Sequence, residues 1–156
     1  MEYEYSFAVS AIDEYIKFCN DNNFNFIDVI KQTRIIYRNK NKTIARLTIE
    51  DNQKTVKKLD FKEDKLTKKD LNVRKESKSL LFDDDNAVES ILEFLRYRKD
   101  NTIVRTRMIY EKVNIRFEID KYEQPNQNFV VAIEGEKKEV DQVYKELLEI
   151  NKKYKI

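Results

Sequence analysis

Much of the chain alternates between apolar and polar residues with the period of a β-strand. Residues 113–120, for example, read Val-Asn-Ile-Arg-Phe-Glu-Ile-Asp. Successive side chains of a strand point to opposite faces, so such a segment predicts a strand with one apolar and one charged face. Comparable patterns predict strands over residues 2–9, 26–38, 43–50, 54–62, 71–80, 101–110, 113–122 and 128–135.

Three other segments carry apolar residues at helical spacing. They are residues 11–21, 85–98 and 137–154. Ser10 is suited to cap the first helix, and the acidic run at 83–85 supplies cap and first-turn charge to the second. Residues 63–70 are polar and predict a loop. The length fits a single domain over residues 1–156.

Eight strands joined by short connections predict a mostly antiparallel sheet. A sheet of this size tends to curl, and three helices can cover only its apolar face. We therefore expect an α+β fold, an eight-stranded antiparallel closed barrel with about three helices packed outside. Its interior would hold charges of both signs, which a polyphosphate with metal ions would satisfy. The alternative is a sheet whose charged face is simply solvated.

Composition narrows the chemistry further. The chain has 31 basic and 29 acidic residues, and its net charge of +2 gives no reason to expect bulk nucleic-acid binding. It contains no His and a single cysteine, Cys19, so catalytic triads and imidazole or thiolate metal sites are excluded. Any metal must be held by oxygen, which favours Mg²⁺, Mn²⁺ or Ca²⁺ over Zn²⁺.

Targeting signals are not evident in the sequence. No basic-then-apolar leader and no apolar run of membrane-spanning length occurs, so we expect a cytoplasmic protein that does not engage membranes. The oligomeric state stays open, with a homodimer among the options.

The charged faces contain pairs of like charges. Glu2 and Glu4 share one strand face and repel each other unless a cation lies between them, which suits a divalent metal. Arg105 and Arg107 repeat this spacing with the opposite sign. If these faces converge, they line a cavity that can hold a metal together with an anion.

The order of these motifs resembles the CYTH superfamily, also called triphosphate tunnel metalloenzymes. Its members include class IV adenylyl cyclases, thiamine triphosphatases and inorganic tripolyphosphatases. The family's charged positions are matched here by Glu2, Glu4, Arg46, Lys58 or Lys62, Arg74, Glu76, Arg105, Arg107, Asp120 and Glu134. The chain departs from the pattern at Ser6, Thr48, Lys78 and Ala132, where the family has Lys, Arg, Glu and Glu.

The resemblance implies metal-dependent hydrolysis of a nucleoside, thiamine or inorganic triphosphate in a charged tunnel whose interior includes the four departures. The implied cofactor is Mg²⁺ or Mn²⁺, and the implied partner is a small molecule carrying the triphosphate. The implied residues are Glu2, Glu4 and Glu134 for the metal; Arg46, Lys58, Lys62, Arg74, Arg105 and Arg107 for the triphosphate; and Glu4, Glu76 and Asp120 for catalysis. Two alternatives stay open: a class IV adenylyl cyclase making cyclic AMP from ATP, and a non-catalytic polyphosphate- or nucleotide-binding module, which the four departures motivate.

Overall fold

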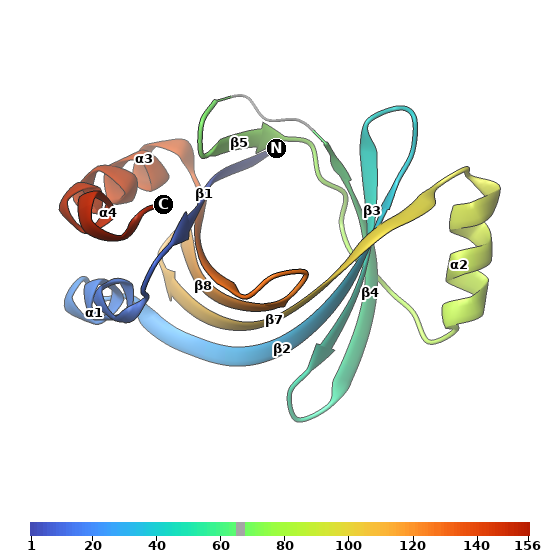
Figure 1. Cartoon of the computed structure of the whole chain (residues 1–156), viewed down its shortest axis with the longest axis horizontal. Helices are drawn as coiled ribbons and strands as arrows, with labels where there is room; N and C mark the ends of the chain where they lie inside the picture. Colours follow the sequence, from blue (N-terminus) through green and yellow to red (C-terminus); the bar gives the residue numbers. More distant parts are fainter. Residues whose placement is uncertain (65–67) are drawn as a thin grey trace.

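The computed structural model describes residues 1–64 and 68–156, in which a strongly curled antiparallel sheet is flanked by helices (Figure 1). The strands are β1 Glu2–Val9, β2 Asn25–Arg38, β3 Thr43–Asp51, β4 Thr55–Glu63, β5 Leu71–Arg74, β6 Leu80–Leu81, β7 Arg98–Lys112, β8 Ile115–Gln124 and β9 Asn128–Gly135. The helices are α1 Asp13–Asp21, α2 Asp85–Phe94, α3 Lys137–Glu146 and α4 Leu148–Tyr154.

The described residues form one nine-stranded sheet in the order β5-β1-β9-β8-β7-β2-β3-β4-β6. Every neighbouring pair is antiparallel. The α+β class and the antiparallel pairing are therefore confirmed. The expected loop over residues 63–70 lies partly outside the described residues.

The prediction of an eight-stranded closed barrel is wrong in strand count and in closure. The strand expected over 71–80 changes partner midway: β5 pairs with β1, whereas β6 pairs with β4 at the opposite edge of the sheet. Between them, a single bridge joins Glu76 to Lys62 of β4. A continuous segment over residues 71–81 thus spans the two sheet edges, pairing first with β1 and then with β4.

The helices lie outside the curled sheet, as expected, but the described residues contain four rather than three. The single helix expected over 137–154 is divided at Leu147, a fully buried residue that is the C-cap of α3 and the N-cap of α4. Ser10 does not cap α1, which begins at Asp13 without a side-chain cap. Asp84 does cap α2, accepting a hydrogen bond from the amide of Ala87 at 3.0 Å. Helix α2 ends at Phe94 rather than at residue 98, and Arg98 is already the first residue of β7.

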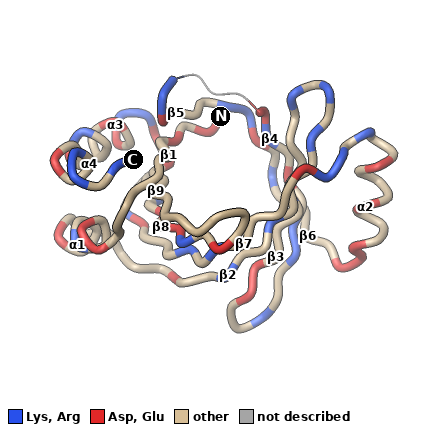
Figure 2. Tube along the Cα trace, viewed as in Figure 1, with Lys and Arg blue, Asp and Glu red and all other residues tan. Residues whose placement is uncertain are grey.

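Two apolar clusters fill the space between the helices and the outer face of the sheet. The larger one packs α1, α3 and α4 against β1, β8 and β9, with Phe117, Ile119 and Ile133 fully buried. The smaller one packs α2 against β2, β3 and β4 around Leu92. Because many apolar strand residues pack against these helices, the alternate residues, many of them charged, face the inside of the curled sheet. Figure 2 shows basic and acidic residues recurring along these strands.

Hydrogen bonds anchor the outer face of β1 to α3. The hydroxyls of Tyr3 and Tyr5 both donate to Asp141, at 2.5 and 3.0 Å, and Tyr5 stacks on Tyr144. Since side chains alternate, this anchor fixes the strand whose inner face carries Glu2 and Glu4.

No helix in the described part of the chain combines the length and apolar character needed to cross a membrane.

Candidate functional site

A highly charged cavity of about 390 Å³ lies on the inner face of the sheet. Among the described residues, nine basic and seven acidic side chains line it. The lining includes every site residue predicted from the sequence: Glu2, Glu4, Arg46, Lys58, Lys62, Arg74, Glu76, Arg105, Arg107, Asp120 and Glu134. The convergence of charged strand faces inferred from periodicity is therefore present.

Three carboxylates from two neighbouring strands form an acidic cluster in this cavity. One oxygen from each of Glu2, Glu4 and Glu134 lies within 4.8 Å of the others. The register explains the grouping, because Glu4 of β1 pairs directly with Glu134 of β9, and Glu2 follows on the same face of β1. Oxygen ligands at this spacing suit a hard divalent cation.

Two members of the acidic cluster carry negative charge that is poorly compensated. Burial raises the pKa of Glu4; together with repulsion by Glu2 and Glu118 it outweighs the attraction of Lys62 and Arg74. Burial, with repulsion by Glu118 and Glu4, raises the pKa of Glu134 to about 7. Burial and mutual repulsion make the ionised form of these carboxylates unfavourable. A metal ion bound between them would neutralise their charge.

Glu2 differs from the other two because cations contact it. The ammonium of Lys62 lies 2.7 Å from its carboxylate, and Arg74 lies 3.7 Å away. In the described part of the chain, Glu4 makes no ion pair and accepts only a long hydrogen bond of 3.3 Å from Asn72. Glu4 is thus the carboxylate of the cluster with the most capacity left for a ligand.

Two of the predicted anion-binding arginines are held by carboxylates directly across the ladder. Arg107 of β7 pairs with Asp120 of β8, and its Nε and Nη2 donate to the two oxygens of Asp120 at 2.8 Å each. Arg46 of β3 likewise donates to Asp60 of β4 at 2.8 and 2.6 Å, and it also contacts Glu76. Such bidentate pairs fix the plane of each guanidinium.

The pKa values follow from these pairs. Burial alone would raise the pKa of Asp120, but Arg107 and Arg105 hold it below its usual range. The same balance lowers the pKa of Asp60, where Arg46 outweighs burial. Asp120, predicted to be catalytic, is therefore ionised and oriented toward Arg107.

Arg105 is only partly compensated. Its Nε donates to Gln32 and its Nη1 to Tyr122, both at 2.8 Å, while Asp120 lies 3.7 Å away. Its buried Nη2 has no hydrogen-bond partner among the described residues. Lys58 is paired with Glu50 at 2.7 Å.

Several residues that line the cavity were not among the predicted site residues, chiefly Arg34, Asp60, Arg116 and Glu118. Three of them stood on the polar faces of predicted strands, so alternation gave their direction but not their role. Arg34 lies in the long apolar-rich segment that became β2. Gln32, Arg34 and Ile36 share one face there, and that spacing was the available signal.

The four departures from the family pattern are not equivalent. Ser6 of β1 and Ala132 of β9 line the cavity and are paired directly with each other across the two strands. Thr48 is buried beside Arg34. The expectation that Lys78 faces the tunnel is wrong: it is exposed and is not among the cavity-lining residues, because the chain changes partner between β5 and β6.

Structural comparisons identify the fold. PH1012 from Pyrococcus horikoshii gives a TM-score of 0.76 at 17% identity, covering 97% of this chain and 88% of that one. HpAC1 from Hippeastrum, described as a candidate adenylyl cyclase with a dominant triphosphatase activity, gives 0.73 at 14% identity, covering 99% and 90%. A chain of the Schizosaccharomyces pombe Mediator head module gives 0.65 at 10% identity, covering 99% and 98%.

Further structures described as candidate adenylate cyclases also match, so the chain has the CYTH-type fold. No family model and no curated protein sequence matches it. At these identities the likeness concerns the fold, and the activity has to be argued from the site itself.

Proposed function

We propose that the protein hydrolyses a triphosphate in its charged cavity with the help of a divalent metal ion. The supporting observation is that one cavity carries uncompensated charge of both signs. The pKa values of Glu4 and Glu134 are raised, while burial and neighbouring arginines lower the pKa of Arg34. Neither a metal alone nor an anion alone would relieve both groups, whereas a metal–polyphosphate complex would.

The candidate metal ligands are Glu2, Glu4 and Glu134. Bound there, Mg²⁺ or Mn²⁺ would neutralise phosphate oxygens and the charge that develops on them. The cluster offers few ligands from the protein, which is typical of sites where phosphate and water complete the coordination.

The candidate anion ligands are arginines and lysines that line the same cavity. Arg105 and Arg107 project from β7 into the cavity with fixed guanidinium planes, which suit adjacent phosphate oxygens. Arg46, Arg74, Lys58 and Lys62 would extend this contact along the anion. Phosphoryl transfer needs chiefly such positioning and charge stabilisation.

The three predicted catalytic carboxylates would then have different tasks. Glu4, which lacks an ion pair among the described residues, would hold the metal and help to orient the attacking water. Asp120 and Glu76 are bound to Arg107 and Arg46, so they would act by positioning these arginines.

A non-catalytic anion-binding module is the second candidate. Ser6 and Ala132 are opposed across the β1–β9 ladder, so the Lys and Glu expected from the family resemblance are replaced together by small side chains. Binding could survive this loss while turnover does not. A class IV adenylyl cyclase is the third candidate and is supported by the names of several proteins with this fold.

The three candidates give different products. The protein, freed of metal with EDTA, would be incubated with Mg²⁺ or Mn²⁺ and with tripolyphosphate, ATP or thiamine triphosphate. Orthophosphate release supports hydrolysis, cyclic AMP with pyrophosphate supports cyclisation, and thermal stabilisation by a triphosphate without any product supports binding alone.

Glu4→Gln tests the role of the acidic cluster. Loss of several kcal/mol of charge stabilisation predicts turnover lowered about 100-fold or more. Glu93→Gln, which changes an exposed carboxylate on α2, is the matched control and should keep wild-type turnover. Equal turnover by wild type and Glu4→Gln would contradict the proposal.

A further inference from the structure

Position 48 is where the family resemblance leads one to expect a second arginine after Arg46, and the chain has threonine there. Thr48 is 1% exposed and is not among the residues that line the cavity. Directly across the β2–β3 ladder from Thr48 stands Arg34. The Nε of Arg34 donates a hydrogen bond of 3.0 Å to the hydroxyl of Thr48.

On each of the two strands adjacent to β2, the residue paired with Arg34 is uncharged. Its cross-strand neighbours are Thr48 on β3 and Ile103 on β7. Arg46 and Arg107, by contrast, each face an aspartate across the ladder and bind it through two nitrogens. No carboxylate in the described residues lies within ion-pair distance of Arg34.

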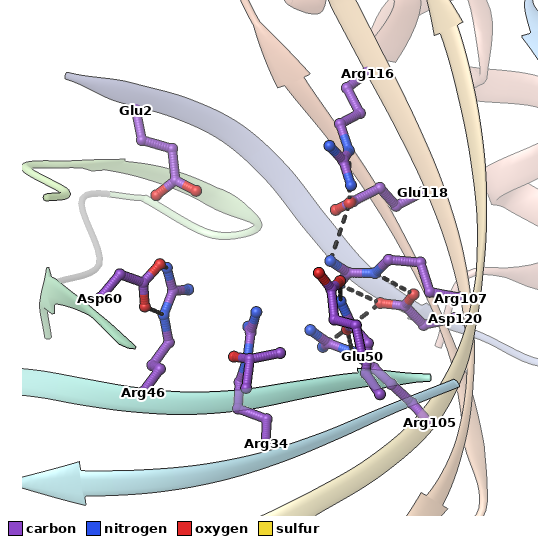
Figure 3. A network of polar contacts seen from close by, with 12 residues as sticks. Glu2, Arg34, Arg46, Glu50, Asp60, Arg105, Arg107, Arg116, Glu118 and Asp120 are labelled. Carbon is purple, nitrogen blue, oxygen red and sulfur yellow. Dashed lines mark hydrogen bonds and ion pairs between the residues drawn. The ribbon is translucent and has the colours of Figure 1, made fainter. Parts of the chain in front are cut away.

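The side chain of Arg34 nevertheless lines the cavity, where it lies between the Arg46–Asp60 pair and Arg105 (Figure 3). Burial and repulsion by Arg105, Arg46 and Arg107 lower its pKa well below the usual value, and the attraction of Asp60 does not offset them. A guanidinium without a countercharge is costly inside a protein, so an anion at this place would relieve it.

We infer that Arg34 is an anion-binding residue that supplies, from the neighbouring strand, the guanidinium missing at Thr48. The Thr48 hydroxyl holds the Nε edge, which leaves the two Nη groups for oxygens of the anion. This inference rests on the proposed function, in that the anion is the polyphosphate part of the substrate. It adds a ligand on β2, a strand that carries none of the expected site residues.

The test measures binding of the P–N–P analogue of tripolyphosphate, with Mg²⁺ present, by isothermal titration calorimetry. Loss of a charge-assisted contact predicts that Arg34→Gln binds roughly tenfold more weakly or worse. Arg98→Gln, an exposed arginine on β7, is the control and should bind as wild type does.

Relocating the charge makes the test specific. Arg34→Thr should bind as weakly as Arg34→Gln, and adding Thr48→Arg to Arg34→Thr should recover most of the affinity. Without ligand, Arg34→Gln should melt at or above the wild-type temperature, because it removes an unpaired charge. A structural role would instead predict a lower melting temperature and no recovery on relocation.

The outcomes distinguish a failure of the Arg34 role from a failure of the proposed function. Arg34→Gln binding within twofold of wild type would refute the role of Arg34, as would weak binding that the Arg34→Thr/Thr48→Arg exchange does not restore. Weak binding accompanied by a lower melting temperature without ligand would also refute it. A wild-type protein that binds no triphosphate with metal present would instead refute the proposed function.

Discussion

Replacing Glu134 by glutamine should stabilise the metal-free protein at neutral and alkaline pH. The substitution keeps the size of the side chain and removes the charge that burial and Glu118 and Glu4 make unfavourable. Glu134 has its ordinary pKa of 4.5 in the unfolded chain and a pKa of about 7 in the folded protein. Between these values the folded protein keeps a proton that the unfolded chain releases, so rising pH favours unfolding.

The magnitude follows from the same two values. Such a displacement of the pKa corresponds to roughly 3 kcal/mol of lost stability above pH 7. Part of the repulsion is shared with Glu4, so we expect Glu134→Gln to recover about 2 kcal/mol at pH 8. The gain should shrink as the pH falls toward 4.5, where the wild-type carboxyl is protonated in both states.

Urea denaturation in EDTA at pH 5 and pH 8, followed by circular dichroism, measures the effect. Glu93→Gln serves as the control and should show no pH-dependent gain, since its carboxylate is exposed. A Glu134→Gln protein that is equally or less stable than wild type at pH 8 would refute the view that the acidic cluster carries uncompensated charge. Added Mn²⁺ should stabilise wild type more than the variant.

Three further substitutions test other parts of the structure. Asp141→Ala removes the acceptor shared by two tyrosines of β1 and should cost about 2 kcal/mol in urea denaturation. Gly135→Ala would bring a Cβ to 2.1 Å from the Asn114 carbonyl oxygen at a φ of +148°, so a loss of about 3 kcal/mol is expected in thermal melts. Asp120→Asn leaves Arg107 buried with one carboxylate fewer and should cost about 3 kcal/mol by the same urea assay; an unchanged midpoint would contradict the pairing.

The site was more predictable from the sequence than the closure of the sheet. Alternation assigns each strand residue to a face, and burial of the apolar face then fixes the charged one. Glu2 and Glu134 could therefore be expected on the inner face although 132 positions separate them in the chain. Their approach to within 4.8 Å depends on which strands are neighbours, which alternation does not encode.

Arg34 shows what the pattern cannot supply. Its inward direction follows from spacing, but its importance depends on its cross-strand neighbours, and these are set by register. Register also explains why Arg46 and Arg107 are neutralised by aspartates while Arg34 is not. The alternation within a single strand does not determine which residues of neighbouring strands are paired.

The segment at 71–80 marks a second limit. Its apolar and polar residues predict one strand, yet the chain divides its pairing between β1 and β4 at opposite edges of the sheet. The local pattern is the same whether a strand has one partner or two in succession. Curvature of the whole sheet, which brings these edges close enough to be spanned, decides between them.

The presence of both signs of charge in one cavity has a thermodynamic consequence. A metal bound by Glu4 and Glu134 would raise the affinity of the arginine side for an anion, because the anion could then contact both. Linkage requires the reverse effect to be equally large, so the anion must tighten the metal by the same factor. Each component would thus bind more weakly alone than in the presence of the other. Measuring metal affinity with and without a bound anion, and anion affinity with and without metal, would give that factor twice.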